Sequence, residues 1–319
     1  MPFLWPKSRS FPLIMTYSVP VLFLTFNRPQ HTRVVLERLR QIQPQRLYVH
    51  CDGPRPQHPT DSENVQQVRA VIETLVDWPC EVHTLFREQN MGLREGVYDA
   101  INWFFGQEPE GVILEDDCVP DPTFFRFCEE MLREYRHDTQ IMHIGGSNLS
   151  QRFTLNLPES FVFSKFSFVW GWASWKRAWE KMSISLDGLD AFAASTQYQQ
   201  FVSNNIAKTY MLDKFRITRA RKNNSWAYAW FYSILKNNGL CIVPKKNLVQ
   251  NVGVGESTAT NTRGADNAAR LQAGSLEWPL IYPLDRVPKA KLEQHFFYSS
   301  QKKRHRLLLW WALKKIGLR

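Results

Sequence analysis

Residues 111–117 read Gly-Val-Ile-Leu-Glu-Asp-Asp, a short apolar run that leads directly into three acidic residues. A run of this kind is typical of a strand that is buried on both faces of a parallel sheet. Three carboxylates at its end repel one another unless a cation neutralises them, and Mg²⁺ and Mn²⁺ favour oxygen ligands. The stretch therefore predicts a divalent metal site, with an acidic surface loop or a helix cap as the alternative.

The residues before this stretch alternate between strand and helix patterns. Strands are predicted over 19–26, 46–50, 80–86 and 111–114, and helices over 30–42, 63–76 and 92–105. This alternation predicts an α/β fold with a mostly parallel, Rossmann-like sheet flanked by helices. Ligands of such sheets bind beyond the carboxyl ends of the strands, so the polar residues that follow each strand are expected to form one site.

Two of these polar segments allow a structural as well as a functional interpretation. Asp52 follows the second strand, where a carboxylate can accept the N–H of a uracil ring, but an Asp before Gly also forms turns. Asn90-Met-Gly-Leu-Arg94 precedes a helix, where Gly92 permits close approach of the backbone and Arg94 can bind phosphate. The alternative for the second segment is a plain loop with a solvated arginine.

Four segments together resemble the GT-A fold nucleotide-sugar glycosyltransferases. They are VPVLFLTFNRP (19–29), Asp52 after its strand, NMGLR (90–94) and VILEDDCVPDPTFFRF (112–127). The last is most similar to the N-acetylglucosaminyltransferase I group and its bacterial relatives, which are often labelled hemolysin-activation-like or family 2-like transferases. The resemblance covers roughly residues 17–265.

The resemblance implies a UDP-sugar donor and a Mn²⁺ or Mg²⁺ cofactor. Asp117 matches the single protein ligand to the metal, Glu115 matches the acid that contacts the donor sugar, and Asp116 lies where ribose and diphosphate pass. Asp52 matches the acid that recognises uracil. The residues expected to bind the donor are Phe26, Asn27, Arg28, Asp52, Gly92, Arg94, Glu115 and Asp116.

Aromatic residues of the second half resemble the acceptor side of the same family. The segment 166–172 reads Phe-Ser-Phe-Val-Trp-Gly-Trp, and the residues expected to line the acceptor are Trp170, Gly171, Trp172 and Trp226. Tryptophan faces stack well on sugars, but a cluster of this kind also forms an ordinary aromatic core.

The chain departs from the family where the general base is expected. The family's Asp position corresponds to Ala227, and an inverting transferase needs a group that takes the acceptor proton. The substitutes that the sequence offers are Glu256 in the NVGVGE segment (251–256) and Asp213. A chain that has lost catalytic activity, and a base position shifted in sequence, are the alternatives.

The charge is distributed unevenly along the chain. The formal net charge is +10, yet residues 301–319 hold seven Lys and Arg and no acid, which leaves about +3 for the rest. This basic segment also contains Leu and Trp, so it predicts binding to an anionic membrane surface, with a helix docked on the body as the alternative. No nucleic-acid partner is predicted.

The five widely spaced cysteines and the absence of a long apolar run predict a cytoplasmic protein, peripheral to the inner face of the membrane. The expected organisation is an N-terminal extension (1–16), a nucleotide-sugar-binding half (17–125), an acceptor-side half (126–285) and a basic tail (286–319). The expected activity is a metal-dependent transfer of sugar from a UDP-sugar to a glycan or glycolipid hydroxyl, with inversion. A catalytically impaired sugar-nucleotide-binding protein and a nucleotidyltransferase are the alternatives.

Overall fold

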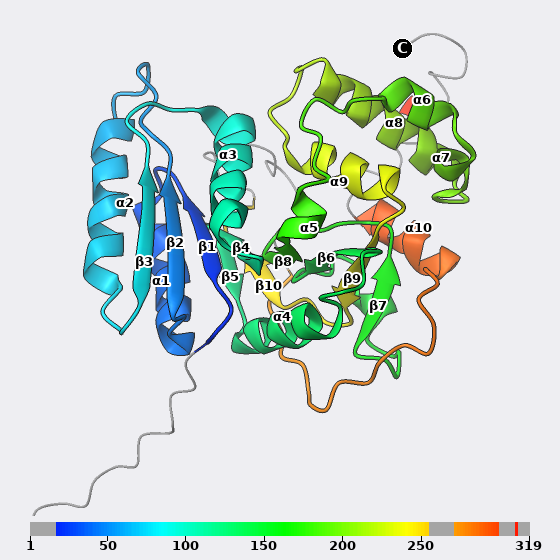
Figure 1. Ribbon diagram of the computed structural model, residues 1–319, viewed down its shortest axis with the longest axis horizontal. Helices are drawn as coiled ribbons and strands as arrows, with labels where there is room; N and C mark the ends of the chain where they lie inside the picture. The colour runs from blue at the N-terminus through cyan, green and yellow to red at the C-terminus, as the bar shows by residue number, and fades with distance from the viewer. Residues whose placement is uncertain (1–16, 255–270, 300–309, 312–319) are drawn as a thin grey trace, which may run out of the picture.

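The computed structural model describes residues 17–254, 271–299 and 310–311, and within them eight strands form one mixed sheet (Figure 1). The strand order across the sheet is β3-β2-β1-β4-β8-β6-β9-β7. Their bounds, in that order, are Glu81–Phe86, Arg46–Cys51, Val21–Thr25, Glu110–Glu115, Trp172–Trp175, Ile141–Gly145, Leu240–Pro244 and Phe161–Ser164. The predicted α/β fold with a mostly parallel, Rossmann-like sheet flanked by helices is confirmed.

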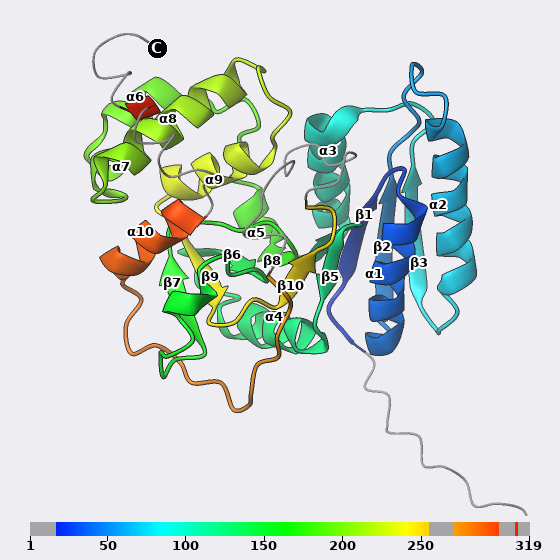
Figure 2. The same cartoon turned by 180° about the vertical axis from the view of Figure 1, so that it is seen from behind.

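The first four strands are parallel and carry helices on both faces. Alternate residues of β1 point to opposite faces, so Val21 and Phe23 belong to one core cluster while Leu22 and Leu24 belong to another. Helices α1 (Pro29–Ile42) and α2 (Asp61–Leu75) pack in the first cluster, and α3 (Gly92–Gln107) packs in the second. Figure 2 shows α1 in front of the sheet, on the face turned away in Figure 1.

The second half continues the sheet with changes of strand direction. Strand β8 runs antiparallel to both β4 and β6, β9 runs parallel to β6, and β7 closes the edge antiparallel to β9. The remaining helices are α4 (Pro122–Glu134), η1 (Gln151–Phe153), α5 (Lys176–Trp179), α6 (Leu189–Ala194), α7 (Thr196–Gln200), α8 (Asn205–Arg219), α9 (Ala227–Lys236) and α10 (Ala290–Ser299). Among the described elements, α6 to α10 lie on the right of Figure 1, beside the antiparallel part of the sheet.

A small second sheet returns the chain to the acidic residues. Strand β5 (Cys118–Pro120) follows β4 after a turn, and β10 (Val249–Asn251) pairs with it in antiparallel register, with Asn251 opposite Cys118. The backbone N–H of Val252 also donates to the carbonyl of Asp117 at 2.8 Å. Residues 251–254 are therefore held directly against the end of β4.

Helix α10 lies within the expected tail (286–319) and is packed on the second half of the chain. Helix α10 buries Phe296 and Phe297 completely in the second-half core, because their rings pack on those of Phe168 and Tyr210. Within the predicted basic segment 301–319 the structure describes Trp310 and Trp311 only, and the extension 1–16 lies outside the described residues. No helix in the described part of the chain is long and apolar enough to cross a membrane.

Candidate functional site

The carboxyl ends of three neighbouring strands bring the predicted residues together. The parallel register pairs Leu24 with Glu115 and Thr25 with Cys51, so β1, β2 and β4 end side by side. Phe26–Arg28, Asp52 and Glu115–Asp117 leave the sheet at this common edge. The sequence predicted this convergence from the strand pattern, and the register explains it.

Arg28 forms ion pairs with two of the three acids. Its guanidinium contacts the carboxylate of Asp116 through two nitrogens, one of them Nε at 3.3 Å from Oδ2, and its Nη1 lies 3.0 Å from Oδ2 of Asp117. The side chains of Asp116 and Asp117 are only 3% and 12% exposed. Arg28 is thus the cation that compensates this buried acidic pair, as buried charges require.

The acids remain short of positive charge. Burial, followed by the charges of Asp117 and Asp116, raises the pKa of Glu115 to about 8. Burial also raises the pKa of Asp116 to about 6, although the nearby Arg28 opposes the shift. Three acids share one guanidinium, so the cluster favours a further cation or a shared proton.

Asp117 is fixed by groups from the small second sheet. Its Oδ1 accepts a hydrogen bond of 3.2 Å from Nδ2 of Asn251. A Cβ on Gly253 would lie 2.5 Å from Oδ2 of Asp117 and 2.9 Å from Nη1 of Arg28, so only glycine fits there without a shift. The sequence did not show these two contacts, because they depend on the pairing of β5 with β10.

The chemistry of the donor set suits a cation at Asp117. No group of three or more His, Cys, Asp and Glu side chains is arranged to hold a metal within residues 17–254, 271–299 and 310–311. A metal there would depend on Asp117 together with ligand and water oxygens, as Mg²⁺ bound to phosphates commonly does. The guanidinium of Arg28 already lies against Asp117, which shows that the position accepts positive charge.

Asp52 binds the backbone that starts α3. Its two oxygens accept hydrogen bonds from the N–H groups of Gly53, Met91 and Gly92 and from the amide of Asn90, at 2.9 to 3.1 Å. Four accepted bonds use the lone pairs of a carboxylate. The turn-forming interpretation therefore describes Asp52 in this structure, and a uracil N–H would have to displace one of these donors.

Arg94 is directed to backbone carbonyls instead of the acidic cluster. Its guanidinium donates to the carbonyl oxygen of Ile184 and, at 3.4 Å, to that of Thr218. The residue is 5% exposed, so the solvated-arginine alternative is wrong. These contacts join α3 to the second half and give no support to a phosphate-binding role. Gly92, the first residue of α3, has a left-handed backbone with φ of 78°, a conformation that favours glycine.

Asn27 belongs to a hydrogen-bonded group with Asp61 and Arg55 that the sequence did not reveal, and Phe26 packs against this group. Nδ2 of Asn27 donates to Asp61 at 2.7 Å, and Arg55 binds the same carboxylate through Nε at 2.6 Å. Arg55 also lies over the ring of Phe26, 5.3 Å from its centre. The hydrogen bond from Arg55 is the main cause that lowers the pKa of Asp61 to about 2. This group fixes the segment that carries Arg28.

The tryptophans assigned to the acceptor side are mostly core residues. Trp172 and Trp226 are 1% and 3% exposed, and their rings stack with centres 5.9 Å apart. Gly171 is packed against Val249, where a Cβ would lie 2.8 Å from a methyl group. Trp172 and Trp226 thus lie in an aromatic core, whereas Trp170 is half-buried and packs against the core cluster that contains Val21 and Phe23.

Ala227, where the resemblance led us to expect a general base, has no acidic group. Ala227 is the first residue of α9, half-buried against the core that contains Trp226. Glu256 lies outside the described residues, and Asp213 lies within α8.

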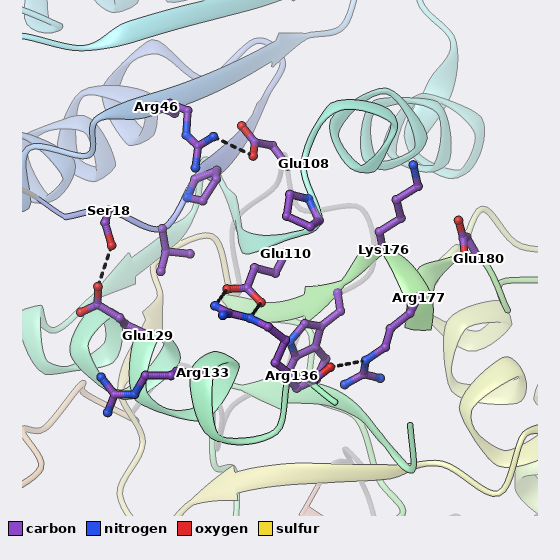
Figure 3. A pocket seen from close by; sticks show the side chains of 14 residues that line it. Ser18, Arg46, Glu108, Glu110, Glu129, Arg133, Arg136, Lys176, Arg177 and Glu180 are labelled. Atoms are coloured by element: carbon purple, nitrogen blue, oxygen red, sulfur yellow. Dashed lines mark hydrogen bonds and ion pairs between the residues drawn. The ribbon is translucent and has the colours of Figure 1, made fainter. Parts of the chain in front are cut away.

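A cavity of about 900 Å³ lies at the opposite edge of the sheet (Figure 3). It is lined by residues at the amino ends of β1 and β4, including Val19, Pro20 and Glu110. Its lining contains two ion pairs, Arg136 with Glu110 at 2.6 Å and Arg46 with Glu108 at 3.1 Å. It contains none of the predicted site residues, so the strand-end cluster is the better candidate site.

No family model and no curated protein matches the sequence. Solved structures to which this chain is similar include HddC from Yersinia pseudotuberculosis, with 9% identity over 50% of this chain and 77% of that chain and a TM-score of 0.30. Mouse xyloside xylosyltransferase 1, apo form, has 11% identity over 68% of this chain and 81% of that chain, with a TM-score of 0.32. UDP-glucose pyrophosphorylase complexed with UDP-glucose has 9% identity over 48% of this chain and 64% of that chain, with a TM-score of 0.26. At these TM-scores the similarities do not define the function of this chain.

Proposed function

We propose that this protein transfers a sugar from a UDP-sugar to a hydroxyl group of a glycan or glycolipid, with a divalent cation at Asp117. The observation that carries the proposal is the cluster of Arg28, Asp116 and Asp117 at the carboxyl ends of β1 and β4. Ligands of α/β sheets bind at this edge, and an acidic cluster with an adjacent arginine suits a metal-bound diphosphate.

Asp117, Arg28 and Glu115 each have a separate proposed role. Asp117 would hold the cation. The planar guanidinium of Arg28 now contacts Asp117, and it can exchange this contact for one to phosphate oxygens. A divalent cation held by Asp117 would neutralise the charge that develops on a diphosphate leaving group. Glu115 is half-buried and has a raised pKa of about 8, so in the neutral form it can donate a hydrogen bond to a sugar oxygen. Inversion at the sugar carbon is proposed from the resemblance alone.

Calorimetry with nucleotides tests the donor. We expect UDP to bind in the presence of Mn²⁺, UDP-sugars to bind similarly, and other nucleoside diphosphates to bind at least ten-fold more weakly. D117N should lose most of the Mn²⁺ dependence. Equal binding of all nucleotides would contradict a UDP-sugar donor and favour a nucleotidyltransferase.

A catalytically impaired sugar-nucleotide-binding protein is the second candidate, and Ala227 favours it. The first residue of α9 carries a methyl group where the resemblance expects a carboxylate, and a methyl group takes no proton. UDP-sugar turnover in the wild type, A227D and A227N separates the two. Turnover by the wild type excludes the impaired protein. A gain in A227D, but not in A227N, with a silent wild type would establish it.

The basic segment 301–319 would bring the enzyme to an acceptor carried by an anionic membrane. Each cation near such a surface contributes about 1 kcal/mol. Trp310 packs edge-on against Tyr210 of α8, with ring centres 5.6 Å apart, so at least this residue docks on the body. Flotation with anionic and neutral liposomes, using the full chain and a chain that ends at residue 300, tests the proposal. Equal flotation of both chains would contradict it.

A further inference from the structure

The ion pair places the guanidinium of Arg28 where the proposed divalent cation would bind Asp117. Oδ2 of Asp117 is the oxygen that Arg28 contacts at 3.0 Å, and it is also the oxygen that faces Gly253. The other oxygen, Oδ1, accepts from Asn251 and lies 3.5 Å from Sγ of Cys118. A metal at Asp117 would therefore meet an oxygen that the guanidinium already uses.

Asp117 does not depend on Arg28 for its orientation. Asn251 holds Oδ1, and the backbone of Val252 binds the carbonyl of Asp117 at 2.8 Å. Gly253 lies closely over both partners of the ion pair. The carboxylate should consequently stay in place when the guanidinium leaves it.

Arg28 has a second partner that can retain it. Two of its nitrogens bind Asp116, whose side chain is almost fully buried, and only Nη1 reaches Asp117. The backbone of Arg28 is also fixed, since its carbonyl accepts from the N–H and the hydroxyl of Thr32 at 3.0 and 2.9 Å. The guanidinium can thus release Asp117 by a small movement while it stays paired with Asp116.

We propose that Arg28 is a built-in counter-ion that competes with the divalent cation for Asp117, so that metal binds well only when a diphosphate draws the guanidinium away. The inference rests on the proposed function and deepens it, since it makes metal and nucleotide binding depend on each other through one side chain. Two like charges a few ångströms apart in a buried site repel strongly, which is why both cannot occupy Asp117 together.

Mn²⁺ binding without nucleotide, measured by the electron paramagnetic resonance signal of free Mn²⁺, tests the competition. We expect R28Q to bind Mn²⁺ at least ten-fold more tightly than the wild type, because the competing charge is gone while Asp117 stays oriented by Asn251. A loss of packing alone would weaken binding, so the direction of the change separates competition from a structural defect. Unchanged or weaker binding in R28Q overturns the inference.

The same titration with saturating UDP completes the test. UDP should strengthen Mn²⁺ binding by a larger factor in the wild type than in R28Q; equal factors would overturn the inference. If R28Q does not fold, R28K replaces it, because lysine keeps the charge but cannot bridge both carboxylates, and its Mn²⁺ affinity without nucleotide should exceed the wild-type value several-fold. Affinity in R28K at or below the wild-type value overturns the inference.

The double variant R28Q/D117N separates failure of the competition from failure of the metal site. If R28Q binds Mn²⁺ and R28Q/D117N does not, Asp117 is the ligand and the comparison with the wild type decides the inference. If neither the wild type nor R28Q binds Mn²⁺ with or without UDP, the proposed metal site fails and the inference fails with it.

Discussion

Asn251 donates a hydrogen bond of 3.2 Å to Asp117, a residue 134 positions earlier in the chain. The bond exists because β10 pairs with β5 in antiparallel register and places Asn251 opposite the residue after Asp117. It joins the acidic end of β4 to the segment that leads toward Glu256. The orientation of Asp117 should therefore depend on Asn251.

Replacing Asn251 should weaken the metal site with little effect on the fold. N251A removes the donor to Oδ1 of Asp117, and loss of such supporting bonds typically costs about 10–100-fold in metal affinity. We expect Mn²⁺–UDP affinity to fall within this range while the melting temperature changes by only a few degrees. Calorimetry and thermal unfolding of N251A and the wild type measure both. Unchanged affinity would show that Asn251 does not orient Asp117.

G253A should disturb the same carboxylate by a different route. The added Cβ would meet Oδ2 of Asp117 at 2.5 Å and Nη1 of Arg28 at 2.9 Å, so the ion pair must shift. We expect a loss of at least ten-fold in UDP affinity measured with Mn²⁺. G106A is the matched control, because no atom lies within 4 Å of a Cβ built there and the helix should gain about 0.5–1 kcal/mol. Similar UDP affinities of G253A and G106A would contradict the close packing of Gly253 on Asp117 and Arg28.

Glu293 should make stability depend on pH. Burial raises its pKa to about 7, while its carboxylate accepts from Ser164 and from the backbone N–H of Lys165 at 2.7 and 3.0 Å. Between about pH 4.5 and 7 the native state holds a proton that the unfolded state releases, so this group lowers stability as pH rises. The loss is complete above pH 7 and is on the order of 3 kcal/mol.

E293Q removes this titration and provides the comparison. The difference in unfolding free energy between E293Q and the wild type should grow in favour of E293Q from about pH 5 to 7. Urea unfolding of both proteins across this range measures it. Parallel stability profiles would contradict the raised pKa.

Trp172 and Trp170 should respond differently to truncation. Trp172 is 1% exposed and packs on Trp226, Trp230 and His143, so W172A should lose about 3–5 kcal/mol of stability. Trp170 is half-buried, so W170A should be milder. Chemical unfolding of both variants checks the order. A greater loss of stability in W170A than in W172A would contradict the assignment of Trp172 to the core.

The strand pattern predicted the parallel half of the fold because β1 and β4 are apolar runs that lead into polar residues, and helical patterns separate them from β2 and β3. The same pattern predicted which ends meet, and so brought Arg28 close to Glu115–Asp117. It could not predict that Arg28 pairs with two of the acids, because side-chain geometry depends on the register of strands far apart in sequence.

Burial was the property that the sequence could not assign to single residues. The motif that contains Trp172 suits both a sugar platform and a core, and only packing against α9 decides for the core. Asp52 and Arg94 are polar residues at a predicted site edge, yet their hydrogen bonds go to the backbone of the protein itself. Helix α10 lies within the segment expected as a basic tail, and the sequence did not show that Phe296 and Phe297 are buried there.

A crystal structure with UDP and Mn²⁺ bound tests the central claim most directly. We expect Mn²⁺ on Asp117 as its protein ligand, the diphosphate beside Arg28, and the guanidinium moved off Asp117 but still paired with Asp116. A nucleotide bound in the cavity at the amino ends of β1 and β4, or a metal held without Asp117, would contradict the proposed site.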